Sequence, residues 1–413
     1  MLRSYKYRLY PTLAQAELIN KHIGACRFVY NLALETKNYA YATQRKNLSV
    51  FELMRQMTQL KKECDWINEV DSQTLQQSLL NLDKAFTRFF KGQSSFPKFK
   101  KKRAGASFRN PHGQYISIKD KRIYQCKFRD GILATIDRPH KGKIRSTTIS
   151  KTPTGKYFIS LLCETGIDIP KKKAIKDKTT IGIDLGLKSF IVTSNGEITD
   201  NPKHLKKSLS RLKFLQRQGS KKKLGSYNRK KANHKIALQH EKITNQRKDF
   251  LHKLSTKLIN NHDTLCFETL NIAGMVKNHN LAQSISDASW AKFVEFCKYK
   301  AEWYGKNILQ IPTFEPSTKM CHVCGQTNNN LTLADRHWTC LKCGTAHDRD
   351  INAAINIKNY SLKNCGGVHR GKSVELPTMV GAMKQKKNAS RQTKNLNNEK
   401  NSRRNRKSTS RME

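Results

Sequence analysis

The segment TIGIDLGLKSFIVTSNGEIT, residues 180–199, decides how the second half of the chain folds. It contains three consecutive runs with strand character, TIGIDLG, KSFIVTS and GEIT. A long basic helical region follows to about residue 260, and after it come the strand pattern DTLCFE, a helix over 288–304 and the strand ILQIP. Consecutive strands followed by single strands that alternate with helices predict an α/β layer with a mixed sheet.

The first of these strands places Asp184 between two glycines. Alternation puts three aliphatic residues on one face of the strand and Gly182, Asp184 and Gly186 on the other. Glycines weaken a strand, and a common reason to keep them is the close approach of a ligand or of another backbone. A metal ion with a phosphate would fit beside Asp184, whereas an Asp that caps a turn is the simpler alternative.

Two more carboxylates occur in settings that suit a metal ion. Glu268 ends the apolar run LCF, where a charged group must be paired, hydrated or bound to a cation. Asp348 and Asp350 precede a run with helical spacing, so both are expected in a cap or first turn, and capping is the expected role of Asp348. Oxygen donors from separate elements suit Mg²⁺ or Mn²⁺ rather than zinc. Two such ions about 4 Å apart would support phosphodiester hydrolysis.

Four cysteines form two CxxC pairs, separated by fifteen residues and each followed by glycine: Cys321, Cys324, Cys340 and Cys343. Four thiolates on two tight turns predict a closed, structural zinc site, and a pair of disulfides is the alternative. His322, His337 and His347 lie in or near the segment. Because four cysteines already satisfy a zinc ion, these histidines are expected at the surface or beside the ligands.

The composition points to a polyanionic partner. Lys and Arg number 79 against 31 Asp and Glu, which gives a net charge of +48 over 413 residues. Nucleic acid is the first candidate for that partner, and an anionic membrane surface is the rival. The chain has no apolar run long enough to span a membrane and no signal-peptide core at its start, and its seven other cysteines are scattered singly. We therefore expect an intracellular protein.

The spacing of apolar residues divides the first half of the chain into a helical part and a strand-like part. Residues 15–92 have helical spacing, whereas residues 1–14 and 93–176 have the alternation of strands, so we expect a helical insertion in one β unit. Residues 361–413 are basic and almost without apolar side chains towards their end. We expect that tail to be disordered, either as a solvated segment or as an arm that contacts RNA.

Two basic stretches are candidates for contact with nucleic acid. The first, SFPKFKKKRAGASFR at residues 95–109, interleaves phenylalanines with Lys98, Lys100 and Arg103. The second is the helical region over 206–253, whose positive charge few acids offset. Its candidate contacts are Arg211, Arg217, Arg229, Lys230 and Arg247.

The motifs GIDLGLK, FETLNI, CxxCG, CxxCG and HDRDINAAINI occur in an order that resembles the TnpB family, the transposon-encoded OrfB proteins related to type V CRISPR effectors. The resemblance extends to RLYPTLAQAELINKHIGACRFVYN, FPKFKKKRAGASFR, RKDFLHKLST and SISDASWAKF, and so covers residues 1–360. It implies a RuvC-like nuclease domain of the RNase H fold at 177–360 with an inserted zinc ribbon at 316–346. It also implies a wedge-like β-barrel domain at 1–14 and 93–176, interrupted by a helical recognition domain at 15–92.

The resemblance also implies a function and a set of site residues. Asp184, Glu268 and Asp350 match the catalytic acids that hold magnesium, the four cysteines match the zinc ligands, and Gln76 matches a contact to a short motif beside the target. The expected activity is RNA-guided cleavage of DNA, by a monomeric protein bound to a guide RNA in a bacterial or archaeal cytoplasm, at the nucleoid. The alternatives are a regulator that binds nucleic acid without cutting it and a transposase that performs strand transfer.

Overall fold

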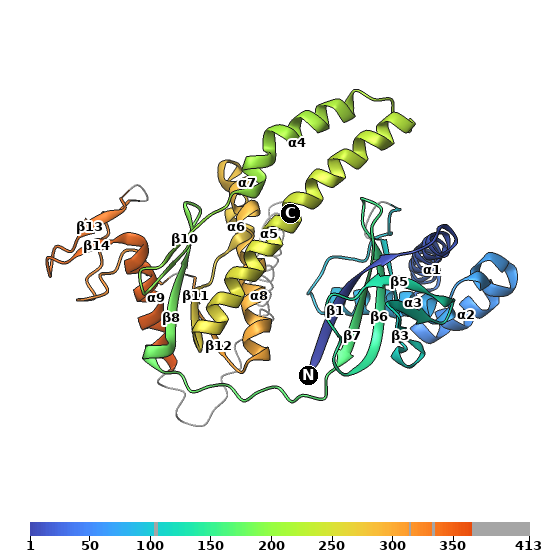
Figure 1. The fold of residues 1–413 in the computed structure, drawn as a ribbon, viewed down its shortest axis with the longest axis horizontal. Coiled ribbons are helices and arrows are strands. Elements are labelled where there is room, and N and C mark those ends of the chain that lie inside the picture. Colours follow the sequence, from blue (N-terminus) through green and yellow to red (C-terminus); the bar gives the residue numbers. More distant parts are fainter. Residues whose placement is uncertain (103–105, 314, 333–334, 366–413) are drawn as a thin grey trace, which may run out of the picture.

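The computed structural model describes residues 1–102, 106–313, 315–332 and 335–365 of the chain (Figure 1). Two lobes, each with its own sheet, are joined by an extended segment (Figure 1). The tail predicted from residue 361 lies outside the described residues from residue 366 onwards, while 361–365 complete the last helix. No helix in the described ranges is long and apolar enough to cross a membrane.

A seven-stranded antiparallel sheet forms the N-terminal lobe, in the order β2-β6-β7-β1-β5-β4-β3. The first strand of the chain lies in its middle and pairs with β7 on one side and with β5 on the other. Among the described residues no pairing closes the sheet between β2 and β3, so a barrel stays a prediction. The strands are β1 (Leu2–Tyr10), β2 (Ala106–Asn110), β3 (Ser117–Lys119), β4 (Arg122–Gln125), β5 (Phe128–Thr135), β6 (Lys143–Lys151) and β7 (Tyr157–Glu164).

Three helices lie between β1 and β2 in the chain and share one hydrophobic core with the sheet. Side chains cap the start of each helix: Thr12 and Ser49 form capping boxes, and Asp71 accepts a hydrogen bond from the Gln73 amide. The helices are α1 (Leu13–Gln44), α2 (Val50–Glu63) and α3 (Ser72–Phe90), with a 3₁₀ turn (Asp65–Glu69) before α3.

A buried histidine joins α1 to the start of α3. His22 lies 2.8 Å through Nδ1 from the Leu18 carbonyl, and its Nε2 accepts the Asp71 amide at 3.0 Å. Its ring stacks on Phe108 of β2 at 4.8 Å. These partners require a neutral ring that is protonated on Nδ1, because a protonated Nε2 cannot accept the amide.

We expect the N-terminal lobe to lose stability in mild acid because of His22. Burial lowers the pKa of His22 below 6.5, so the unfolded chain binds the proton more readily, and stability falls as the pH drops through about 6.5. His22→Gln should lower the melting temperature at pH 7.5 and flatten its dependence between pH 7.5 and 5. The exposed His234→Gln is the control. An unchanged pH dependence in His22→Gln would contradict this role.

The C-terminal lobe is built on a five-stranded sheet in the order β10-β9-β8-β11-β12. β8, β9 and β10 pair antiparallel, whereas β8, β11 and β12 run parallel, which confirms the predicted mixed sheet. The strands are β8 (Thr180–Leu185), β9 (Ser189–Thr193), β10 (Ile198–Asp200), β11 (Thr264–Glu268) and β12 (Asn307–Ile311).

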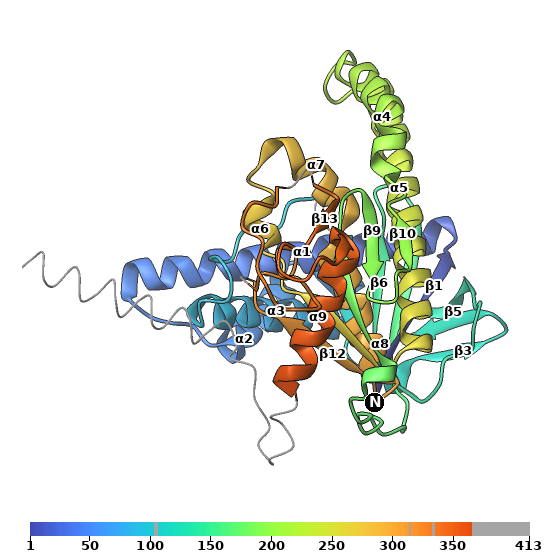
Figure 2. The ribbon, with the colours of Figure 1, turned by 90° about the vertical axis from the view of Figure 1, so that its left-hand side faces the viewer.

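Helices cover both faces of this sheet. On one face Ile181, Ile183 and Phe267 pack against α5 and α8, and on the other Cys266 packs against Ile357 of α9. α4 and the outer part of α5 form a hairpin that projects away from the sheet (Figures 1 and 2). The helices are α4 (His204–Ser220), α5 (Tyr227–Asn261), α6 (Ile272–Met275), α7 (His279–Ala288), α8 (Trp290–Trp303) and α9 (Arg349–Cys365).

A small hairpin with its own cluster of buried residues precedes α9. It consists of β13 (His337–Thr339) and β14 (Ala346–Asp348), and β14 runs directly into α9. The buried apolar residues of this segment are two cysteines, Leu331 and Trp338, too few to form a conventional core. A segment of this kind ordinarily needs a metal ion or another cross-link to hold its fold.

Candidate functional site

Asp184 and Glu268 lie side by side at the ends of two parallel strands. β8 and β11 pair in register, with Ile183 opposite Phe267, so Asp184 and Glu268 are the next residues along the two strands. Their side chains belong to the sheet face that α9 covers, because Ile183 and Phe267 pack on the other face. The strand register thus brings together two carboxylates that are 84 residues apart in the sequence.

Asp184 has a strongly shifted pKa. Burial, and after it the negative charges of Asp350 and Glu268, raise the pKa of Asp184 from 3.8 to about 7, against the opposing charge of Arg349. Burial also raises the pKa of Glu268, whose carboxylate makes no hydrogen bond or ion pair within the described ranges. Carboxylates that repel one another in a partly buried site are stabilised by a bound cation.

Two arginines hold Asp350 in the first turn of α9. Arg336 donates from Nη1 to both carboxylate oxygens, at 2.9 and 3.2 Å, and Arg349 donates to one of them from Nε and Nη2, at 3.2 and 3.1 Å. Asp348 accepts the backbone amides of Asp350 and Ile351 at 3.0 and 2.9 Å. The predicted capping role of Asp348 is therefore confirmed.

The three carboxylates approach one another without closing around a single point. Within the described residues, the cysteine cluster is the only group of three or more potential ligands whose atoms all lie within 4.8 Å of one another. The Asp350 carboxylate is held by its two arginines, and it and Glu268 each repel the charge of Asp184. In charge and in donor type this set fits Mg²⁺ or Mn²⁺, which would compete with Arg336 and Arg349 for Asp350.

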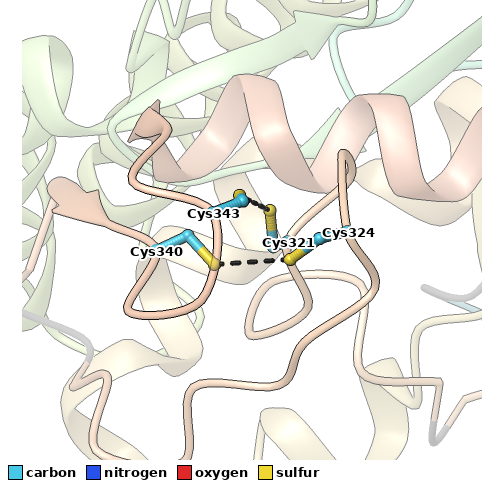
Figure 3. Close-up of side chains that lie close together, drawn as sticks. All are labelled: Cys321, Cys324, Cys340 and Cys343. Atoms are coloured by element: carbon cyan, nitrogen blue, oxygen red, sulfur yellow. Dashed lines mark hydrogen bonds between the residues drawn. The ribbon is translucent and has the colours of Figure 1, made fainter.

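The four cysteines gather from two turns at one end of the hairpin (Figure 3). The Sγ atoms of Cys321 and Cys343 are 3.7 Å apart, and those of Cys324 and Cys340 are 3.5 Å apart. Tetrahedral zinc with Zn–S bonds of about 2.3 Å separates its sulfur ligands by about 3.8 Å, so the cluster fits zinc. Hydrogen bonds from Thr345 lower the pKa of Cys343 to about 6, which favours the thiolate.

We expect Cys343→Ser to remove the zinc. Serine cannot supply a thiolate, so the variant should hold well under one zinc per chain while the wild type holds one. Cys126→Ser is the matched control, because Cys126 is also exposed and lies in the other lobe. Elemental analysis of the two purified variants is the measurement, and a full zinc content in Cys343→Ser would contradict the assignment.

α9 is fastened to the first cysteine turn by two asparagines. Asn352 Nδ2 and Asn356 Nδ2 both donate to the Met320 carbonyl, at 2.8 and 2.6 Å, and Asn352 Oδ1 accepts the His322 amide at 3.0 Å. Both asparagines are buried. The residues on either side of Cys321 are therefore fixed to the helix that carries Asp350.

The three histidines of this segment have different positions. His337 is exposed, His322 lies 2.9 Å from Asn352 Oδ1, and the buried His347 lies 3.1 Å through Nε2 from Cys321 Sγ. None of them belongs to the group of four ligands, in line with the expectation that they lie at the surface or beside the cysteines.

Gln76 and the predicted contacts in the first basic stretch have distinct settings. Gln76 is half-buried on α3, and Lys98 is exposed. The Lys100 backbone exchanges hydrogen bonds with Asn31, and its Nζ lies 3.9 Å over the Tyr30 ring. Arg103 lies outside the described residues.

The predicted contacts of the α4–α5 hairpin divide into two kinds. Arg211, Arg217 and Lys230 are exposed on the hairpin. Arg229 donates to the Ser220 and Lys222 carbonyls and closes the turn, and Arg247 donates to Asp287 at 2.6 Å. The last two guanidinium groups have structural partners inside the chain, which the sequence did not indicate.

Arg336 and Arg349 are the site residues that our sequence analysis missed. Arg349 stands between two acids in HDRD, a position that could have been recognised as part of the site. Arg336 is 14 residues from Asp350 and has no local signal. Only the turn of the hairpin back onto α9, where the Arg349 amide donates to the Arg336 carbonyl at 2.8 Å, brings Arg336 to the carboxylates.

Comparison with known families and proteins gives a consistent set of relatives. Residues 161–279 match the OrfB_IS605 family, described as a probable transposase, and residues 290–357 match the Cas12f1-like TNB domain. Residues 1–46 match the helix-turn-helix domain of OrfB_IS605 proteins, although β1 and one long helix, α1, occupy most of this range.

Two relatives match most of the chain. A putative RNA-guided DNA endonuclease of Streptomyces pristinaespiralis is 38% identical over 365 residues, which are 86% of this chain and 88% of the relative. The putative RNA-guided DNA endonuclease InsQ of Escherichia coli K12 is 29% identical and covers 88% of this chain and 94% of its own. Among solved structures, the Cas12f1–sgRNA–target DNA complex shares the fold, with a TM-score of 0.55 at 16% identity over 84% of this chain and 83% of that one.

Proposed function

This chain belongs to the OrfB family of transposon-encoded, TnpB-like proteins, and we propose on that basis that it is an RNA-guided DNA endonuclease. The observation that carries the proposal is the convergence of Asp184, Glu268 and Asp350, where burial and then the charges of Asp350 and Glu268 raise the pKa of Asp184 to about 7. Two acids that act on a third in this way, from β8, β11 and α9, suit phosphodiester hydrolysis better than a purely structural role.

The proposed chemistry assigns a task to each residue of the site. Mg²⁺ or Mn²⁺ bound by Asp184, Glu268 and Asp350 would supply an activated water and stabilise the leaving oxygen. Asp348 keeps the first turn of α9 in place for Asp350. Arg336 and Arg349 neutralise Asp350 in the free protein and would be available to a DNA phosphate when a cation replaces them.

The finer domain assignments are part of the same proposal. Residues 177–360 would form a RuvC-like nuclease domain with a zinc ribbon at 316–346. Residues 1–14 and 93–176 would form a wedge-like domain, and 15–92 a recognition domain in which Gln76 contacts the target-adjacent motif. A guide RNA held on the basic surfaces would select the target by base pairing, in a monomeric ribonucleoprotein at the nucleoid of a bacterial or archaeal cell.

The test uses the full chain, purified with the RNA that it binds. We expect it to linearise a plasmid that carries a target complementary to the co-purified guide, in a reaction that requires Mg²⁺ and stops with a chelator. A chain that binds no RNA at low salt would overturn the proposal. Target binding without cleavage would favour a regulator, and covalently joined DNA products would favour strand transfer.

A further inference from the structure

A cavity of about 360 Å³ lies between α1, α3 and β2 in the N-terminal lobe, far along the chain from the three carboxylates. Its wall is apolar at Ile23 and Phe108 and polar at Thr74, Gln77 and Asn81. Small-ligand sites have volumes of this order and combine apolar walls with a few fixed polar groups.

Two amide side chains on α3 fix each other in the wall of this cavity. Gln77 Nε2 donates to Asn81 Oδ1 at 3.1 Å, one helical turn away, and Gln77 is 5% exposed. Gln77 Oε1 and Asn81 Nδ2 have no hydrogen-bond partner in the described part of the chain, and neither is sealed off from the surface. The pair therefore offers one acceptor and one donor that are held at a fixed spacing.

The rim of the cavity is basic. Arg27 of α1 and the exposed Lys101 and Lys102 line it, and the segment that carries the lysines is anchored because the Lys100 backbone exchanges hydrogen bonds of 3.1 and 2.8 Å with Asn31. Arg27 makes no hydrogen bond or ion pair among the residues that the structure describes. A group that enters this cavity would therefore carry a negative charge at its outer end.

We propose that this cavity holds an adenine base of the bound nucleic acid, with its phosphate on the basic rim. The exocyclic amino group of adenine would donate to Gln77 Oε1 while a ring nitrogen accepts from Asn81 Nδ2, the donor–acceptor match that Gln and Asn amides make with adenine. Guanine and thymine present a carbonyl where Gln77 needs a donor. Cytosine has an amino group beside a ring acceptor as adenine does, so oligo(dC) is included in the test as the competing base. The inference rests on the proposed function and deepens it, because it names a base and the residues that select it.

The experiment measures binding of fluorescent single strands to the full chain at about 0.3 M salt, where sequence-independent phosphate contacts are weakened. The probes are oligo(dA), oligo(dT), oligo(dC), oligo(rA) and an oligomer of deoxynebularine, which is adenine's ring without the amino group. Tighter binding of oligo(dC) than of oligo(dA) would overturn the choice of adenine. We expect oligo(dA) to bind about tenfold more tightly than the nebularine oligomer. If oligo(rA) binds more tightly than oligo(dA), the adenine belongs to the RNA. If oligo(dA) binds more tightly than oligo(rA), it belongs to the DNA.

Variants distinguish binding in the cavity from binding through the general positive charge of the protein. Gln77→Met and Asn81→Leu preserve bulk but remove one polar group each, and Gln56→Met is the control on the exposed face of α2. Gln77→Met should lose the preference for adenine over nebularine, Asn81→Leu should weaken the binding of both oligomers, and both variants should keep the affinity for oligo(dT). Equal binding of adenine and nebularine oligomers by the wild type would overturn the inference. So would a preference for adenine that survives Gln77→Met, or an unchanged affinity of Asn81→Leu for both oligomers, in variants that keep the wild-type melting temperature. Plasmid cleavage, measured separately, tests the proposed nuclease.

Discussion

Asp184→Asn is expected to reduce DNA cleavage by at least about a thousandfold, a loss of roughly 4 kcal/mol of transition-state stabilisation. Asparagine keeps the shape of the side chain but removes a charge that the proposed metal site needs. RNA and DNA binding should be unchanged, because they depend on basic surfaces away from β8. Single-turnover cleavage and gel-shift titration, made on the same preparation, are the measurements.

The same variant should be more stable than the wild type at alkaline pH. The folded state raises the pKa of Asp184 to about 7 from 3.8, so folding favours the protonated form. The stabilisation that protonated Asp184 contributes is fully present below about pH 4 and is lost as the pH rises through 7, because the partly buried carboxylate must then ionise next to Asp350 and Glu268. Asp184→Asn cannot ionise and avoids this cost of a few kcal/mol.

Melting temperatures at pH 5.5 and 8.5 in magnesium-free buffer check this expectation. The difference in melting temperature between Asp184→Asn and the wild type should be larger at pH 8.5 than at pH 5.5, in favour of the variant. Asp200→Asn is the control, since Asp200 is an exposed carboxylate on β10 of the same sheet. A variant that still cleaves, or one that is destabilised equally at both pH values, would contradict the role given to Asp184.

Local periodicity predicted most of what positions the site. The alternation in TIGIDLG placed Asp184 and Gly182 on the face opposite the aliphatic core, and β8 has this arrangement. The glycines predicted the close approach of a ligand or of another backbone, and at Gly182 the neighbour is the α9 backbone. The cysteine spacing predicted a four-ligand cluster, and the four sulfurs lie together. Each of these features depends on a few consecutive residues.

Contacts between distant segments could not be predicted in this way. Arg247 and Arg229 were chosen as candidate contacts for their charge, yet Asp287 and the carbonyls of the hairpin turn occupy them. Arg336 reaches Asp350 only because the hairpin folds back onto α9. The amide pair of Gln77 and Asn81 has ordinary helical spacing, and only packing against β2 makes it part of a cavity wall. A sequence pattern gives the direction of a side chain but not its partner.

Gly182→Ala is expected to destabilise the C-terminal lobe and to abolish cleavage, although Gly182 is not one of the proposed metal ligands. An added Cβ would lie 2.0 Å from the Ala354 carbonyl oxygen and 2.9 Å from the Lys358 amide nitrogen. Both neighbours are backbone atoms of α9, so the whole helix must move away from β8. Overpacking of this kind costs about 3 kcal/mol or more, which lowers the melting temperature of a lobe of this size by roughly 6–12 °C.

Gly24→Ala is the matched control for the same added methyl group. Gly24 lies inside α1, and nothing is within 4 Å of the Cβ position, so alanine should raise stability by up to about 1 kcal/mol through its helix propensity. Displacement of α9 would also move Asp350 away from Asp184, so Gly182→Ala should lose cleavage even at temperatures where it stays folded. Thermal melts and cleavage at low temperature separate the two effects. A Gly182→Ala protein with wild-type melting and cleavage would show that β8 and α9 do not need this close contact.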